Sequence, residues 1–193
     1  PALLAPRGAR FPHWMAREAA DTSRRVLLVL DGLGWHQLQE RRHLVPTLGS
    51  LAGGPITTVA PSTTATALTS ITTGLTPGEH GLVGYRIEIA GEILNVLRWG
   101  TSSGDARRSI EPSSTQPFAP FLGERIPVVS KAELESTAFT EAHLRGSRPR
   151  GWRALSSLPV VVAEQLANGE RFVYAYYDGI DKIAHERGFG AYY

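Results

Sequence analysis

The chain has 193 residues, of which 42% are hydrophobic and 20% are charged, a size and composition that predict one globular domain with a buried core. The formal net charge is only +2 and both signs are interspersed, so charge gives no case for a nucleic-acid partner. The sequence contains no cysteine, which excludes disulfides, thiolate metal sites and cysteine nucleophiles. The longest apolar run is too short to be a membrane-spanning segment.

The first elements predicted are two strands and a helix. RVLLVL at residues 25–30 is an unbroken apolar run that ends at an Asp-Gly pair, which is typical of a parallel strand buried on both faces. Residues 35–42 have a helical composition. Residues 56–59 form a short β-branched run before an Ala-Pro pair, which predicts a second strand.

A second helix is predicted over residues 62–73, where Ala65, Leu68 and Ile71 or Thr72 recur at the helical period. A glycine follows the pattern directly and a proline lies shortly beyond it, as is usual at the end of a helix. The hydroxyl-rich stretch APSTTATALTS therefore contains the start of this helix.

The remaining elements continue the alternation of strands and helices. Residues 82–96 contain two strand-like pieces separated by Gly-Glu, which predicts a hairpin. Residues 101–120 are rich in serine, glycine, proline and charge, and they predict a surface loop or lid. We expect further elements in this order: a strand at 126–129, a helix at 158–168, a strand at 172–177, and a loop leading into 181–187. This alternation predicts an α/β fold, a three-layer sandwich with a mostly parallel central sheet.

Polar side chains follow three of the predicted strands. Asp31 ends the first, the hydroxyl cluster ends the second, and Asp178, Asp181 and His185 follow the strand at 172–177. Because ligands bind at the carboxyl ends of the strands in open α/β sheets, parallel strands would bring these groups to one edge.

Asp181 and His185 are four residues apart, so on a helix both would project from one face and could bind the same ion. A carboxylate and an imidazole without thiolates suit zinc or a similar divalent cation. The structural alternative is a helix N-cap at Asp181 with an exposed histidine one turn later. Asp31 and Asp178 each precede glycine, so both also suit turns.

The hydroxyl cluster has two interpretations. Ser62 or Thr63 is suited to cap the following helix, and later hydroxyls would lie on the helix surface. A helix N-terminus is also where backbone N–H groups bind anions, so a hydroxyl in the first turn is placed to attack a phosphoryl group. A neutral alcohol is a poor nucleophile, and a neighbouring divalent metal would supply its alkoxide.

The motifs resemble a known family. Asp31 after an apolar strand, then PSTTATALTSITTGLTPGEHGLVGY, then YYDGIDKIAH, are similar in order and spacing to the alkaline phosphatase superfamily, and most similar to its type I phosphodiesterase / nucleotide pyrophosphatase branch. The resemblance implies that Thr64 is a metal-bound nucleophile and Asp31 a metal ligand. It further implies that Asp181 and His185 bind a metal and that His80 is structural.

The resemblance also implies a cofactor and a reaction. Two divalent metal ions, most simply zinc, would support two-step phosphoryl transfer through a phosphothreonine at Thr64. Backbone N–H groups at Thr64 and Ala65, together with Arg86 or Arg98, would hold the phosphate oxygens. The partner would be a small-molecule phosphate ester or a nucleotide, with phosphodiesters and pyrophosphates ranked first. Phosphomonoesters and phosphonates stay open.

The sequence departs from the family pattern in two places. Residues 65–68 read Ala-Thr-Ala-Leu where the family has an aromatic-Pro-Asn-His run. The family's later Asp-His pair and final histidine have no counterpart before Tyr193, so we expect residues 1–193 to be the N-terminal part of a larger catalytic domain. The alternatives are a non-catalytic fragment or degenerate domain of the same superfamily, and a doubly wound nucleotide-binding protein. The last lacks both G-x-x-x-x-G-K-S/T and G-x-G-x-x-G.

Overall fold

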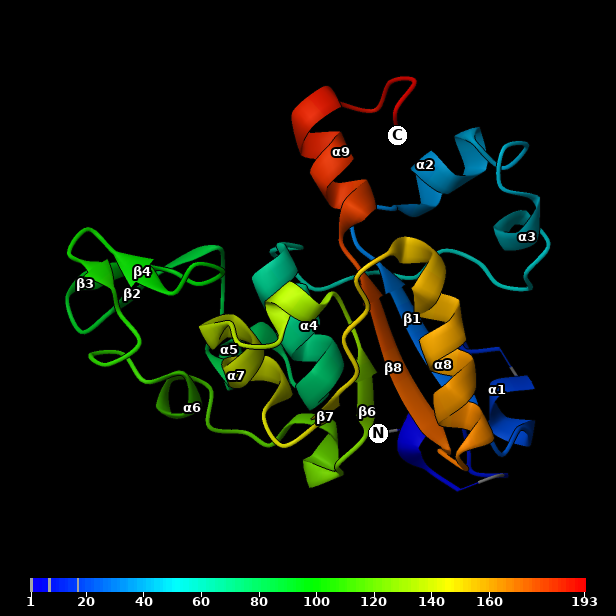
Figure 1. The fold of residues 1–193 in the computed structure, drawn as a ribbon, viewed down its shortest axis with the longest axis horizontal. Coiled ribbons are helices and arrows are strands. Elements are labelled where there is room, and N and C mark those ends of the chain that lie inside the picture. Colours follow the sequence, from blue (N-terminus) through cyan, green and yellow to red (C-terminus); the bar gives the residue numbers. More distant parts are fainter. Residues whose placement is uncertain (1, 7, 17) are drawn as a thin grey trace.

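The computed structural model describes residues 2–6, 8–16 and 18–193. Within them, a parallel sheet has the strand order β1 (Arg25–Leu30), β8 (Phe172–Tyr177), β6 (Pro127–Val129) and β7 (Arg148–Pro149). A smaller antiparallel sheet consists of β2 (Arg86–Ile89), β3 (Glu92–Asn95), β4 (Gly100–Thr101) and β5 (Gly104–Asp105). Figure 1 shows the smaller sheet standing to one side of the larger one.

Helices lie on both faces of the parallel sheet (Figure 1). The α-helices are α1 (Glu18–Asp21), α2 (Trp35–Glu40), α3 (Pro46–Gly49), α4 (Thr64–Thr73), α5 (Pro77–His80), α6 (Pro112–Thr115), α7 (Ala138–Leu144), α8 (Leu158–Ala167) and α9 (Gly179–Arg187). Short 3-10 helices are η1 (Ala2–Leu4), η2 (Pro120–Gly123), η3 (Ala132–Leu134) and η4 (Leu155–Ser157). The predicted α/β fold with a mostly parallel central sheet is confirmed.

The interior strand β8 organises both halves of the core. Phe172, Tyr174 and Tyr176 alternate along the strand and pack in one apolar cluster with α4 and α7. Val173 and Ala175 point to the opposite face and pack in a second cluster with α8. Because both faces of β8 are covered, its sequence is an apolar run rather than an alternating one, as expected for a buried parallel strand.

Strand β1 forms where it was predicted, but the expected burial of both its faces is wrong. Val26 and Leu28 are 42% and 43% exposed. The reason is position: β1 is the outermost strand of the sheet order, and α8 packs on β8 and β6 instead. The apolar sequence of β1 therefore does not indicate whether helices cover one face of the strand or both.

The strand expected at residues 56–59 is not formed. These residues have no regular secondary structure, and Ile56 is 64% exposed. A β-branched sequence favours extended backbone, but a strand also needs a neighbour to supply hydrogen bonds. In the described structure β1 pairs with β8, and residues 56–59 pair with no strand.

The region between α5 and β6 is more structured than its composition predicted. The expected hairpin is present as β2 and β3, with its turn at Ala90-Gly91. Residues 101–120 contain part of β4, all of β5 and α6, and Ile110 and Gln116 within them are buried. A lid function of this segment stays a prediction.

The elements predicted near the site match their observed bounds closely. Helices α2 and α8 and strand β6 lie within the expected ranges, and residues 181–187 belong to α9.

Among the residues that the structure describes, no helix combines the length and apolarity that crossing a bilayer would need.

Candidate active site

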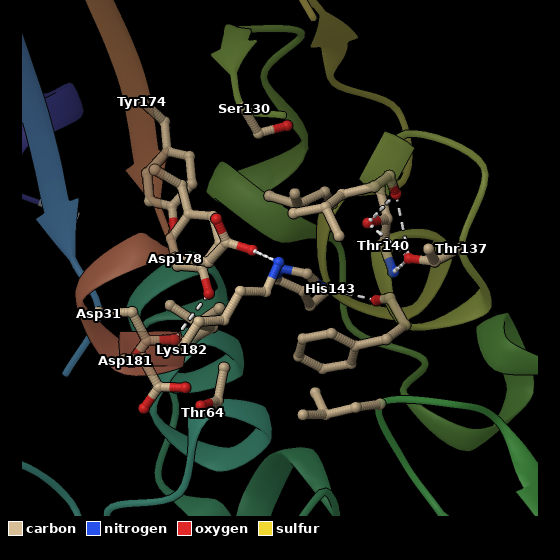
Figure 2. A pocket seen from close by; sticks show the side chains of 16 residues that line it. Asp31, Thr64, Ser130, Thr137, Thr140, His143, Tyr174, Asp178, Asp181 and Lys182 are labelled. Carbon is tan, nitrogen blue, oxygen red and sulfur yellow. Dashed lines mark hydrogen bonds and ion pairs between the residues drawn. The ribbon is translucent and has the colours of Figure 1, made fainter. Parts of the chain in front are cut away.

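The ends of β1 and β8 place two carboxylates next to each other. Leu30 pairs with Tyr177 in parallel register, and the Asp31 N–H donates to the Tyr177 carbonyl at 3.0 Å. Asp31 and Asp178, the residues that follow this pair, therefore leave neighbouring strands at the same edge of the sheet. Figure 2 shows both carboxylates at one end of a cavity.

A close backbone contact brings α9 to the same edge. Gly32 adopts a φ of 80°, and a Cβ at this position would lie 2.5 Å from the Asp181 Cα atom. Only glycine combines this left-handed backbone with such an approach. The contact holds the first turn of α9 against the loop after β1, so Asp181 lies beside Asp31.

The start of α4 distinguishes two adjacent threonines. Thr63 is the N-cap residue, and its hydroxyl pairs with the Thr66 hydroxyl at 3.1 Å. Thr64 is the first helical residue, and its side chain lines the cavity that contains Asp31. At the other end, Gly74 takes the left-handed conformation that terminates the helix.

The cavity has a volume of about 220 Å³, and its polar end consists of Asp31, Thr64, Asp178, Asp181 and Lys182 (Figure 2). The carboxylates of this end repel one another. Burial raises the pKa of Asp181 above its ordinary value, the charges of Asp31 and Asp178 raise it further, and His185 and Lys182 oppose the rise. This end of the cavity therefore favours a cation.

Two neighbours orient the carboxylates. The Tyr176 hydroxyl donates to Asp31 Oδ2 at 2.6 Å, and burial together with the Asp31 charge raises the pKa of Tyr176, so it remains a donor. Lys182 Nζ pairs with Asp178 Oδ2 at 2.5 Å. Sequence reasoning did not select Lys182, although its position four residues after Asp178 at the start of α9 was the available signal.

His185 lies one turn after Asp181, as predicted. Its Nε2 is 3.5 Å from Asp181 Oδ1, and its side chain is 80% exposed. The two side chains therefore share a face of α9, but His185 is not among the residues that line the cavity.

Of the three predicted substrate contacts, Ala65 lies beside Thr64 and the two arginines lie elsewhere. Ala65 has a fully buried side chain, although its backbone N–H is in the first turn of α4. Arg86 begins β2, and Arg98 follows β3, in the antiparallel part of the chain. Neither arginine lines the cavity, and Figure 1 shows β2 and β3 to the left of α4, whereas α9 stands above it. The structure does not bring these arginines to Thr64.

His80 has a structural environment. It is fully buried, and its Nδ1 accepts from the Leu82 N–H at 3.2 Å, so Nε2 carries the proton and donates to Ser70 Oγ at 2.9 Å. The ring thereby joins the middle of α4 to the turn after α5.

The donors at the polar end fit a divalent cation in type. Asp31 and Asp181 offer carboxylates and Thr64 a hydroxyl, and His185, which does not line the cavity, offers an imidazole one turn after Asp181. They do not complete a coordination shell: in residues 2–6, 8–16 and 18–193 no group of three or more His, Asp or Glu side chains is arranged to hold a metal. The expected zinc ions stay a prediction.

The central parallel sheet between helical layers is an alkaline-phosphatase-like architecture. Residues 25–103 match the family model of type I phosphodiesterase / nucleotide pyrophosphatase, which is part of the alkaline phosphatase superfamily, and this match confirms the resemblance. The description of that family names two hydrolytic activities on phosphate groups. The matched segment includes Asp31 and Thr64, whereas Asp181 and His185 lie outside it. A comparison of the chain with curated proteins gives no match.

Proposed function

We propose that the protein hydrolyses small-molecule phosphate esters, with phosphodiesters and nucleotide pyrophosphates as the first-ranked substrates and Thr64 as the nucleophile. The observation that carries the proposal is one juxtaposition. The Thr64 side chain, at the start of a ten-residue helix, lines the same end of the cavity as Asp31 and Asp181.

The start of α4 supplies the first part of the mechanism. The N–H groups of Thr64 and Ala65 belong to the first helical turn, where they have no acceptor within the helix and can donate to phosphate oxygens. A phosphorus atom held there lies within reach of Thr64 Oγ. The Oγ–P bond forms as the bond from phosphorus to the leaving oxygen breaks, and a diester keeps its second ester group on phosphorus. Water then cleaves the Oγ–P bond, which releases the phosphate product and restores the Thr64 hydroxyl.

The carboxylates supply the second part. Asp31, Asp178 and Asp181 would repel an anionic phosphate, so substrate binding at this end requires positive charge in addition to Lys182. Divalent ions held by Asp31, Thr64, Asp181 and His185, with zinc favoured by the donor types, would lower the pKa of the Thr64 hydroxyl and stabilise the leaving oxygen. The role of Tyr176 is to keep the Asp31 carboxylate oriented.

Paired threonine variants test the proposal. Hydrolysis of bis-p-nitrophenyl phosphate is measured with added zinc, manganese or magnesium for the wild type, Thr64→Ala and Thr63→Ala. We expect Thr64→Ala to lose about a thousandfold or more in kcat, because no nucleophile remains. Thr63→Ala is the matched control, since the Thr63 hydroxyl pairs with Thr66 and its side chain does not line the cavity.

The outcomes separate the alternatives. Loss of activity in Thr64→Ala with retention of most activity in Thr63→Ala supports the nucleophile assignment, and equal losses contradict it. If the wild type hydrolyses none of a panel of phosphate mono- and diesters with any of the metals, the non-catalytic alternative is correct instead.

A further inference from the structure

The cavity continues from Thr64 into a second, largely apolar part under α7. Its walls are Leu68 of α4, Leu97 after β3, Leu134 of η3, and Phe139 and Leu144 of α7. We call this part of the cavity the apolar subsite. It adjoins the polar end, so one molecule can have its phosphate beside Thr64 and its organic group in the apolar subsite.

His143 is the polar group within these apolar walls. The residue is 4% exposed, its ring stacks on Phe139 with centroids 4.0 Å apart, and its Nδ1–H donates to the Phe139 carbonyl at 2.6 Å. This bond fixes the neutral tautomer, so Nε2 has a free lone pair. Burial lowers the pKa of His143 to about 4, which keeps Nε2 an acceptor at neutral pH. No hydrogen bond to Nε2 is present among the described residues.

Tyr174 is a second buried polar residue in the cavity wall. Its hydroxyl is buried and has no hydrogen-bond partner in the described structure, and burial raises the pKa of the phenol, which remains protonated. Buried polar atoms without partners are rare because each loses its hydration without compensation. The Tyr174 hydroxyl is such an atom, and His143, with Nε2 as an acceptor, lines the same cavity, so a ligand there can contribute hydrogen-bonding groups.

We propose that the apolar subsite binds the organic group of the phosphate ester and selects a compact, uncharged, ring-sized group with an N–H or O–H donor, which His143 Nε2 accepts. This inference rests on the proposed function, because Thr64 fixes the position of the phosphate. The whole cavity, polar end included, has a volume of about 220 Å³, which leaves room in the apolar subsite for about one ring system. The apolar walls supply affinity, and His143 supplies selectivity.

Non-hydrolysable phosphonates test the subsite by binding alone. Dissociation constants are measured calorimetrically, at one fixed metal concentration, for methylphosphonate, phenylphosphonate, and the 2-, 3- and 4-hydroxyphenylphosphonates with their fluoro isosteres. We expect phenylphosphonate to bind about tenfold or more tightly than methylphosphonate, because the ring enters the apolar walls. At least one hydroxyl isomer should bind about tenfold more tightly than its fluoro isostere.

Two variants test which residue causes the preference for a hydroxyl group. In His143→Phe the preference for hydroxyl over fluorine should fall below about twofold, while phenylphosphonate keeps its advantage over methylphosphonate. Thr140→Val is the matched control, because the Thr140 hydroxyl also lies in the wall but already donates to the Leu134 carbonyl at 2.7 Å. It should keep the hydroxyl preference.

The results that overturn the inference are independent of catalysis. Equal binding of phenyl- and methylphosphonate, or a wild type that prefers no hydroxyl isomer, contradicts the subsite, and neither result requires a variant that folds. A hydroxyl preference that survives in His143→Phe contradicts the role of His143. Failure of the proposed function would instead appear as hydrolysis that persists in Thr64→Ala.

Discussion

His143 makes the stability of the fold depend on pH in a defined window. His143 belongs to α7, and its ring is buried in the wall of the cavity. Burial lowers the pKa of His143 from the ordinary 6.5 to about 4. In the unfolded chain the same side chain binds a proton near pH 6.5. The folded state therefore binds fewer protons than the unfolded state between these two values, and its stability falls as the pH falls.

The size of this effect follows from the two pKa values. Their difference of about 2.5, at about 1.4 kcal/mol for each pH unit, amounts to about 3 kcal/mol. The contribution is fully present above pH 6.5, decreases progressively below it, and is lost once the pH is below about 4. Against a total stability of about 5–15 kcal/mol for a typical domain, this is a large fraction.

The assay is urea unfolding of the wild type and His143→Phe at intervals between pH 4 and 7.5. The phenyl ring keeps the stacking position on Phe139 and removes the titrating group. We expect the free energy of unfolding of the wild type, relative to the variant, to fall by about 3 kcal/mol from pH 7.5 to pH 4. A difference that stays constant over this range, or that grows as the pH falls, would refute the burial argument.

Three further predictions concern the polar end of the cavity. Gly32→Ala should lower the free energy of unfolding, measured by chemical denaturation, by about 2–4 kcal/mol, because the new Cβ would overlap the α9 backbone and φ is positive. Gly78→Ala is the control: Gly78 has open space around it, so the free energy of unfolding should change by about 0.5 kcal/mol or less. Asp181→Ala or His185→Ala should lower the bound metal measured by elemental analysis, and unchanged stoichiometry would exclude them as ligands. Tyr176→Phe should weaken metal affinity about tenfold in a competition titration without changing the stoichiometry at saturation; unaltered affinity would remove its orienting role.

Local sequence patterns predicted the elements whose formation depends on their own sequence or on the burial of both their faces. Helix α4 has the apolar period and ends at Gly74, and β8 is an unbroken apolar run because helices cover both of its faces. The strand ends also predicted that Asp31, the hydroxyl cluster, and Asp178, Asp181 and His185 would meet at one edge. Asp31, Thr64, Asp178 and Asp181 line one cavity, whereas His185 does not.

The features that the sequence did not predict depend on which elements pack next to one another. The apolar pattern of β1 is the same whether one face is covered or two, so the exposure of Val26 and Leu28 required the sheet order. The segment at 56–59 has strand composition but no partner for its backbone. His143 was not predicted either, because its importance comes from its place in the wall of a cavity whose other residues, such as Tyr174, are distant in sequence.

The central claim is that Thr64 carries the phosphoryl group during hydrolysis. The direct test is rapid acid quenching of the protein during turnover of bis-p-nitrophenyl phosphate, followed by proteolysis and tandem mass spectrometry of the peptide that contains residues 62–66. Because the second ester stays on phosphorus when the first p-nitrophenolate leaves, we predict one p-nitrophenylphosphoryl group on Thr64 in the wild type and none on that peptide in Thr64→Ala. The same group on Thr63, or turnover without any modified peptide, would contradict the account.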